Sequence, residues 1–215
     1  MPKQLLREAI WVEGAAGVLE ALIEYPKTVD ETTPVAIVSH PHPAHGGAMT
    51  NKVVHTLARA FNLSGMIAVR FNFRGVGASE GHYDEGRGEL ADLFSVIGWA
   101  RDRWPDVPVT LAGFSFGAAM TVRASQEVTA ERLVLVAPPV GRILDAEEQI
   151  PAEVPVLVVQ GAKDELVDAD AVIAWSDTQP PGIRVAVLDE ADHFFHGQLI
   201  ALRELLVEHL APAAS

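Results

Sequence analysis

The sequence predicts an α/β fold: a mostly parallel sheet of about eight strands, with an antiparallel hairpin at its N-terminal edge and helices on both faces. The first observation behind this prediction is that short apolar runs alternate along the chain with segments of helical period. The second is that no internal repeat, low-complexity stretch or linker interrupts this alternation. Residues 1–215 are therefore expected to form a single domain.

The hairpin is expected where two extended runs, 6–12 and 18–24, flank Gly14 and Gly17. The remaining strands are short apolar runs, expected at 35–39, 66–71, 107–112, 132–137, 154–159 and 183–188. Helices are expected between these strands, at 51–63, 88–103, 116–125, 168–176 and 194–210. The first two show helical spacing most clearly, through Val53, Val54, Leu57 and Phe61 and through Leu90, Leu93, Phe94 and Ile97. Residues 211–215 are expected to be a frayed tail.

Composition restricts the function. The formal net charge is −13, from 29 acidic and 16 basic side chains, and this charge would repel nucleic acids and anionic lipids. The chain has no cysteine, which excludes disulfides, thiolate metal sites and a cysteine nucleophile. No apolar run reaches the length of a membrane span, and the first ten residues lack the apolar region of a secretory signal. We expect a cytoplasmic protein whose partner is a small molecule, not a nucleic acid or a membrane.

The pentapeptide Gly113-Phe114-Ser115-Phe116-Gly117 joins a predicted strand to a predicted helix. A serine at such a junction lies in a tight, strained turn that presents its hydroxyl group. The flanking glycines are needed because a Cβ atom there would collide with the neighbouring strand or helix. The same pattern also occurs at ordinary strand-to-helix turns, so its context decides. That context makes Ser115 the candidate nucleophile.

Two further polar residues follow predicted strands. Asp164 follows the strand at 154–159, and His193 follows the strand at 183–188. Because the carboxyl ends of parallel strands meet at one edge of a sheet, these side chains are expected near Ser115. A neutral imidazole accepts the serine proton, and a carboxylate fixes the tautomer of that imidazole. The chain order Ser, Asp, His is the one found in α/β-hydrolases.

Alternatives remain for two of these roles. His196 is the alternative base, although it is expected inside the first turn of the last helix, whereas His193 stands in the preceding loop. If Asp164 is only a loop or helix-capping acid, its role falls to another carboxylate. The candidates are Glu165, Asp189 and Asp192.

With these motifs the sequence resembles the α/β-hydrolases over nearly its whole length, and it is similar to their small lidless branch near the dienelactone hydrolases. Besides the three motifs above, the matching stretches are His-Pro-His-Pro at 40–43, Gly-Gly-Ala-Met-Thr-Asn-Lys-Val-Val at 46–54 and Asn-Phe-Arg-Gly-Val-Gly at 72–77. The resemblance implies an α/β-hydrolase fold and acyl-transfer chemistry. Dienelactone hydrolases use a cysteine nucleophile where this chain has Ser115, so a dienelactone substrate is not implied.

Acyl transfer also requires two N–H donors that stabilise the developing oxyanion. One is expected from the backbone of Phe116, directly after the nucleophile. The second is expected from the loop that follows the strand at 35–39. Both prolines of this loop lack an N–H group, so the backbone of His42 is the first donor available. The amide of Ala44 is the alternative.

The same loop raises the alternative of a metal site. His40, His42 and His45 have the His-x-His-x-x-His spacing of zinc loops in metallo-β-lactamase-like hydrolases. However, Ala44 replaces the acid of that pattern, and two prolines restrict how the rings converge. The glycine-rich segment 74–81 lacks the Gly-Lys-Ser and Gly-x-Gly-x-x-Gly patterns of phosphate-binding loops. We therefore expect neither a metal nor a cofactor.

Lidded α/β-hydrolases usually carry their cap between the strands that here are expected at 132–137 and 154–159. The segment between them, 138–153, has room for only a turn and one short helix. We therefore expect no cap domain and an open site, with an acyl pocket lined by Phe114, Pro138, Pro139, Val140 and Phe194.

Together these features predict a serine carboxylesterase that cleaves small acyl esters through an acyl-enzyme. An amidase, a thioesterase or an acyltransferase would use the same groups, since only the leaving group or acceptor differs. A catalytically silent binding protein of the same fold is the alternative from another class.

Overall fold

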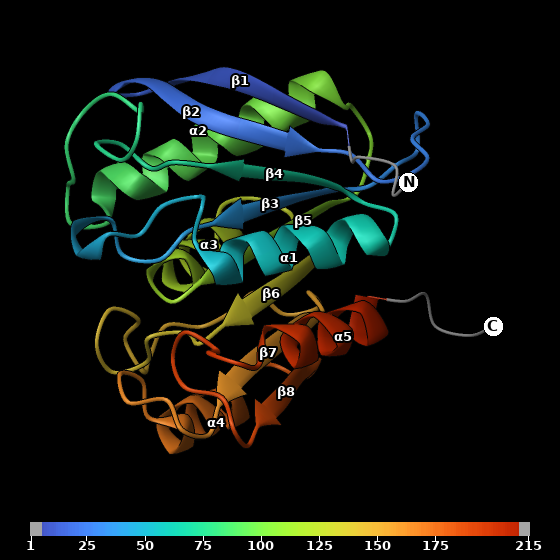
Figure 1. Ribbon diagram of the computed structural model, residues 1–215. Helices are drawn as coiled ribbons and strands as arrows, with labels where there is room; N and C mark the ends of the chain where they lie inside the picture. The colour runs from blue at the N-terminus through green and yellow to red at the C-terminus, as the bar shows by residue number, and fades with distance from the viewer. Residues whose placement is uncertain (1–5, 211–215) are drawn as a thin grey trace.

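Within residues 6–210, which the computed structural model describes, eight strands form one sheet (Figure 1). The tail expected at 211–215 lies outside this range. In chain order the strands are β1 (Arg7–Gly14), β2 (Gly17–Glu24), β3 (Val35–Ser39), β4 (Ile67–Phe71), β5 (Val109–Phe114), β6 (Arg132–Val136), β7 (Val156–Gly161) and β8 (Ile183–Leu188). Across the sheet their order is β1-β2-β4-β3-β5-β6-β7-β8.

The sheet is parallel except at its N-terminal edge. β1 and β2 pair as an antiparallel hairpin, in register from Arg7 opposite Glu24 to Gly14 opposite Gly17. β2 then pairs antiparallel with β4, and every later pair of neighbours is parallel. The predicted sheet of about eight strands with an N-terminal hairpin is therefore confirmed.

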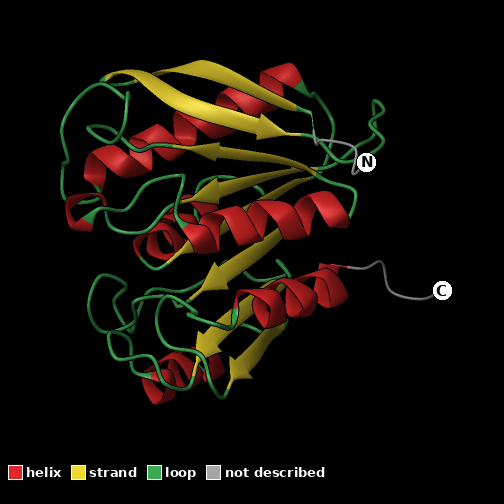
Figure 2. Cartoon of the chain, viewed as in Figure 1, coloured by secondary structure: helices red, strands yellow, loops and turns green. Residues whose placement is uncertain are grey.

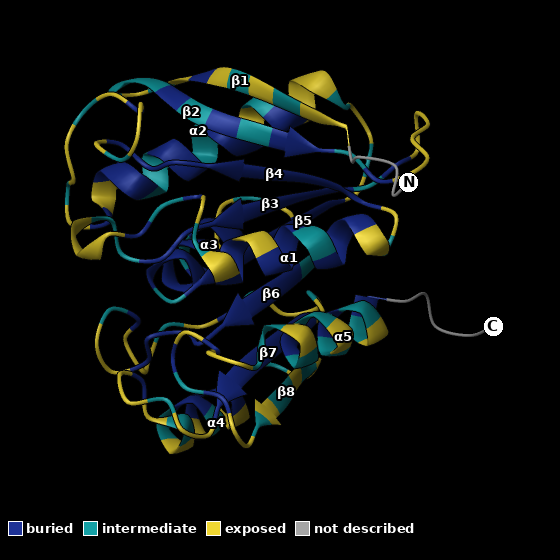
Figure 3. Ribbon diagram, viewed as in Figure 1, coloured by how far each residue is buried: buried dark blue, intermediate teal, exposed yellow. Residues whose placement is uncertain are grey.

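Helices cover both faces of the sheet (Figure 2). α1 (Lys52–Leu63) and α5 (Leu199–Leu210) lie side by side on one face. The opposite face is covered by α2 (Arg87–Arg103), α3 (Phe116–Ser125) and α4 (Ala169–Asp177). Because both faces are covered, the central strands are buried throughout, whereas β1 and β8 at the two edges are partly exposed (Figure 3). This burial explains why the central strands are continuous apolar runs.

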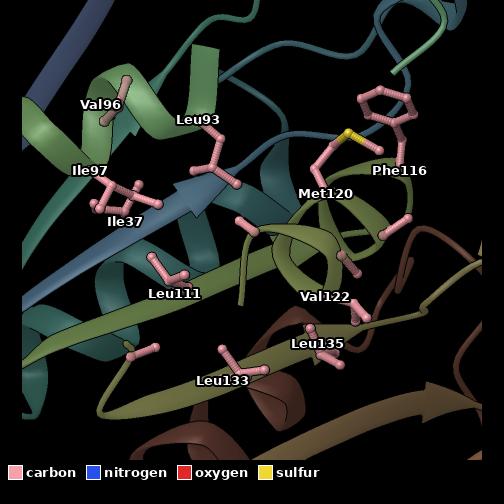
Figure 4. Close-up of a cluster of buried hydrophobic side chains, with 14 of the residues drawn as sticks. Ile37, Leu93, Val96, Ile97, Leu111, Phe116, Met120, Val122, Leu133 and Leu135 are labelled. Carbon is pink, nitrogen blue, oxygen red and sulfur yellow. The ribbon is translucent and has the colours of Figure 1, made fainter. Parts of the chain in front are cut away.

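The core between the sheet, α2 and α3 shows what fixes the central strands (Figure 4). Its members are buried aliphatic and aromatic side chains, among them Ile37, Leu93, Val96, Ile97, Leu111, Phe116, Met120, Val122, Leu133 and Leu135. Burial of each large apolar side chain stabilises the fold by about 1.5–3 kcal/mol. The carboxyl ends of the parallel strands, where the loops gather at the left of Figure 1, therefore rest on a rigid base.

The last helix begins later than the sequence predicts. α5 starts at Leu199, not at 194, because local turns compete with helix formation before it. The Asp192 carboxylate accepts hydrogen bonds from the backbone N–H and the ring of His196. Phe195 and Gly197 both have a positive φ, of 54° and 71°. The prediction that His196 lies in the first turn of this helix is therefore wrong; it lies in the turn before it.

The glycine-rich stretch after β4 is a structural turn fastened by buried polar contacts. The Asn72 side chain accepts a hydrogen bond from the Met49 N–H and donates one to Glu20. Arg74 binds the buried Asp92 of α2 through its backbone N–H and its guanidinium. Gly77, with a φ of 58°, leaves no room for a side chain beside Asn72. These contacts give the residues of the 72–77 motif a structural role in holding this turn.

Candidate active site

Ser115 occupies a strained junction between β5 and α3. Its φ of 53° and ψ of −118° lie where L-residues rarely occur. A Cβ atom at Gly113 would stand 2.2 Å from the backbone of Gly117, and one at Gly117 would stand 2.3 Å from the Ser39 carbonyl oxygen. Both glycines are therefore required by close backbone approach, as the sequence predicts.

Three loops at the carboxyl edge of the sheet bring Ser115, Asp164 and His193 together. The Nε2 atom of His193 lies 3.1 Å from the Ser115 Oγ atom. The Nδ1 atom of the same ring lies 2.8 Å from the Asp164 Oδ2 atom. The imidazole therefore connects a hydroxyl group to a carboxylate. His193 is buried, with only 3% of its surface exposed.

The Asp164 carboxylate is buried and is held by four hydrogen bonds. Besides His193, Gln160 donates to Oδ2, and the backbone N–H groups of Leu166 and Val167 donate to Oδ1. Burial raises the pKa of Asp164, but the hydrogen bonds from His193 and the backbone outweigh it, so the pKa lies below its ordinary value. At neutral pH this carboxylate is ionised beside the imidazole.

The alternative residues lie elsewhere. Asp192 hydrogen-bonds to His196, whose side chain is 71% exposed and makes no hydrogen bond to Ser115 within residues 6–210. Glu165 accepts only a long bond, 3.4 Å, from the backbone N–H of His193, and within the same range Asp189 makes no hydrogen bond to that ring. Asp164 is thus the acid that contacts the His193 ring in the described part of the chain.

The backbone N–H groups of His42 and Phe116 lie near Ser115 and make no hydrogen bond within residues 6–210. The alternative donor, the Ala44 N–H, is instead bonded to the Nδ1 atom of the His42 ring at 3.2 Å. The carbonyl of His42 accepts the N–H groups of His45 and Gly47, which closes the loop tightly. The arrangement leaves the His42 and Phe116 N–H groups available to a negatively charged oxygen.

The three histidine rings of this loop do not converge. His40 is buried and bonded on both nitrogens: Nδ1 donates to the Pro41 carbonyl, and Nε2 accepts the Phe73 N–H. Burial lowers the pKa of His40 to about 4, so this ring stays neutral. His42 stacks on His45, with ring centres 4.3 Å apart. Within residues 6–210 no group of three or more His, Cys, Asp or Glu side chains is arranged to hold a metal ion.

Two small pockets flank Ser115, with volumes of about 90 and 120 Å³. Both are lined by Leu166 and His193, together with the loop 41–47. Of the residues expected to line an acyl pocket, Pro139 lies in the first and Phe194 in the second. The expectation is wrong for Phe114, Pro138 and Val140, which are buried and line neither pocket. The ring of Phe114 instead packs against that of His193, with ring centres 5.2 Å apart.

Sequence reasoning missed several pocket residues. Arg142 and Ile143 belong to the segment 138–153, which forms turns and no helix, and Leu166 belongs to the loop that holds Asp164. Tyr83 lies 3.2 Å, through its hydroxyl, from the ring of His42. None of these residues stands in a motif. One available signal for Arg142 was its position in the segment that replaces a cap.

The chain is similar in sequence and fold to several known proteins. Residues 42–149 match the model of a family described as serine aminopeptidase, S33. A solved α/β serine hydrolase homologue from Coxiella burnetii is 44% identical over 95% of this chain and 97% of its own, with a TM-score of 0.90. An α/β serine hydrolase without a lid from Xanthomonas campestris is 40% identical over 100% of this chain and 99% of its own, with a TM-score of 0.88.

A curated relative, an uncharacterized protein of Rickettsia prowazekii, is 33% identical over 86% of this chain and 81% of its own length. In the described part of the chain no helix has the length and apolar character needed to cross a membrane. Nor does any domain interrupt the segment between β6 and β7. The chain therefore belongs to the serine aminopeptidase S33 family and is a lidless α/β serine hydrolase.

Proposed function

We propose that the protein is a carboxylesterase that hydrolyses small acyl esters through a covalent acyl-enzyme. The observation that carries this proposal is the chain of contacts from Ser115 through His193 to the ionised Asp164. A serine hydroxyl is a weak nucleophile unless a base takes its proton as it attacks. The contact between His193 and Ser115 supports His193 as this base, and the contact of its second nitrogen with Asp164 supports the same role.

In the proposed mechanism the Ser115 Oγ atom attacks the ester carbonyl while the His193 Nε2 atom takes its proton. Asp164 accepts the Nδ1–H of the ring and stabilises the imidazolium that forms. His193 then gives the proton to the departing alcohol, leaving Ser115 acylated. A water molecule, deprotonated by the same imidazole, attacks the acyl-enzyme, and the serine is released.

The oxyanion of each tetrahedral intermediate is assigned to the backbone N–H groups of Phe116 and His42. Both are without a partner among residues 6–210, so neither donor has to leave another bond before it acts. The Ala44 alternative is disfavoured because its N–H is already bonded to the His42 ring.

Ester hydrolysis is proposed in preference to removal of an N-terminal amino acid. A substrate with a free α-ammonium group requires a carboxylate in the pocket. The residues that line the two pockets beside Ser115 include no acidic side chain, and Arg142 would repel such an ammonium. An uncharged or anionic substrate fits this lining better.

The test combines labelling with a substrate panel. A fluorophosphonate probe should label the wild type and fail to label Ser115→Ala, because only an activated serine reacts. Methyl and p-nitrophenyl esters should be hydrolysed faster than matched thioesters, acyl anilides and aminoacyl p-nitroanilides. Faster cleavage of the aminoacyl anilides would assign the site to peptide cleavage. If the probe does not label the wild type and no substrate is turned over, the result would favour a catalytically silent binding protein of the same fold.

A further inference from the structure

A cation borders the pocket beside Ser115. Arg142 lines it together with Ser115 and His193. Its Nη1 atom donates a hydrogen bond to the Leu166 carbonyl, at 2.7 Å. Within residues 6–210 no carboxylate lies within ion-pair distance of this guanidinium. By contrast, Arg123 binds the neighbouring Ile143 carbonyl and is neutralised by Glu148 at 2.8 Å. Arg123 and Arg142 therefore both make hydrogen bonds that hold the segment 138–153. Of these two arginines, Arg123 is paired with a carboxylate and Arg142 is not.

The position of this charge is tied to the reacting atoms. The Leu166 carbonyl that anchors Arg142 belongs to the loop whose N–H groups, at Leu166 and Val167, bind Asp164. The same carboxylate orients His193 toward Ser115. The guanidinium is therefore tied by a hydrogen bond to the loop that holds Asp164, and its other N–H donors make no hydrogen bond within residues 6–210.

The surroundings favour an anion at this place. Pro139, Ile143 and Val167 form an apolar wall of the pocket, against which the methylene groups of an acyl chain can pack. Asp164 is already bound to His193, and the residues that line the two pockets beside Ser115 include no carboxylate. On a chain with a net charge of −13, an anionic substrate is repelled over most of the surface, so a local cation is needed to hold it.

We propose that Arg142 binds a carboxylate at the far end of the acyl chain, so that the substrates are half-esters of short dicarboxylic acids. The carboxylate accepts two parallel N–H bonds from the guanidinium, a geometry that arginine provides and lysine does not. This inference rests on the proposed esterase function and names its substrate class.

The experiment compares monomethyl glutarate with methyl pentanoate, whose acyl chains have the same length and differ in the terminal carboxylate. Acid release is followed at constant pH, and the ratio of the two kcat/KM values is the readout. Arg142→Gln should lower the glutarate-to-pentanoate ratio about 10- to 100-fold, the effect of a lost bond to a charged group. Arg142→Lys should restore part of the ratio, because it keeps the charge.

Arg101→Gln is the matched control. Arg101 is also exposed and donates to a backbone carbonyl, that of Thr129, at 2.7 Å, and it lies outside the pockets beside Ser115. Its ratio should equal that of the wild type. If methyl pentanoate is hydrolysed and Arg142→Gln leaves the ratio unchanged, the carboxylate site is wrong while the esterase proposal stands.

If the wild type hydrolyses no ester, the esterase proposal fails, and glutarate binding measured by calorimetry decides the inference. Binding that weakens about 10- to 100-fold in Arg142→Gln, and not in Arg101→Gln, supports the anion site. Absence of glutarate binding to the wild type, or equal binding to both variants, overturns it.

Discussion

The loops that carry His40 and His193 both bury an imidazole at the same edge of the sheet, yet the two rings differ in what they can do. Both nitrogens of His40 are hydrogen-bonded to backbone groups, the Pro41 carbonyl and the Phe73 N–H. This ring therefore has no free nitrogen with which to accept a proton from a reacting group. His193 has a carboxylate on one nitrogen and a hydroxyl group on the other. Burial alone therefore does not make a histidine a catalytic base; the groups hydrogen-bonded to its two ring nitrogens determine whether it can act as one.

His196 adds a third case. Its Nδ1 atom lies 2.8 Å from the Asp192 carboxylate, the same distance as that between His193 and Asp164. The side chain of His196 is 71% exposed, against 4% for His193, and it does not reach Ser115. A histidine–carboxylate pair is thus insufficient to form the proposed site unless a hydroxyl group can donate its proton to the other nitrogen of the ring.

Removal of the Ser115 hydroxyl takes away the group that distinguishes His193 from His196. Ser115→Ala should lower kcat by about 10⁴- to 10⁶-fold, by analogy with other serine triads. The half-buried position and small size change should leave the fold intact, which circular dichroism checks. A folded variant that keeps a tenth of the wild-type ester hydrolysis would refute the nucleophile assignment.

Replacement of each paired histidine tests the comparison directly. His193→Ala should lower kcat/KM by about 10⁴-fold, because the serine then lacks its base. His196→Ala, which removes an exposed ring bonded to a carboxylate in the same way, should retain at least half of the activity. Equal losses in the two variants would show that the contact with Ser115 does not separate their roles.

The buried ring of His40 should appear in the pH dependence of stability. Its pKa is lowered by burial from 6.5 to about 4, so the unfolded chain binds the proton more tightly than the folded one. Stability contributed by the neutral ring is complete above pH 6.5 and is lost as the pH falls toward 4. The loss amounts to about 3 kcal/mol across this window.

Urea unfolding of the wild type and His40→Gln, at several pH values between 7.5 and 4, measures this contribution. The glutamine variant is less stable at neutral pH but has the shallower dependence, since it cannot be protonated. Parallel curves would show that His40 does not supply the acid sensitivity.

The two pockets beside Ser115 should have a smaller effect, which is on the preference for acyl-chain length. Each buried methylene adds about 0.8 kcal/mol, or roughly a fourfold gain in kcat/KM, while the pocket still covers it. Because the two pockets have volumes of only about 90 and 120 Å³, uncharged esters should be cleaved best between acetyl and hexanoyl. Preference for palmitoyl over butyryl p-nitrophenyl esters would contradict this.

For removal of metal ions we expect no effect on activity. Treatment with EDTA should leave ester hydrolysis unchanged, because the proposed steps use a serine, an imidazole and backbone donors and need no Lewis acid. A loss of activity that added zinc restores would reassign His40, His42 and His45 and reverse the contrast between the two loops.

The fold and the three central residues were predictable because their signals are local or follow from chain order. Apolar runs mark buried parallel strands, and Gly113 and Gly117 mark the Ser115 junction. The start of α5 was not predictable, because the Asp192 side chain stabilises turns that compete with the helix. The place of Arg142 depends on a contact with Leu166 across 24 positions of sequence, which no periodicity reveals.

Gly117 carries no side chain, and its lack of a Cβ atom allows the close approach of the two segments that carry the proposed oxyanion donors. The place where that methyl would stand is occupied by the carbonyl oxygens of Ser39 and His40, at 2.3 and 2.7 Å. Any side chain there would push the loop carrying His42 away from the segment carrying Phe116. The separation of the two proposed donors is therefore set by contact between backbone segments, so replacing this glycine should displace the donors although no reacting group is altered.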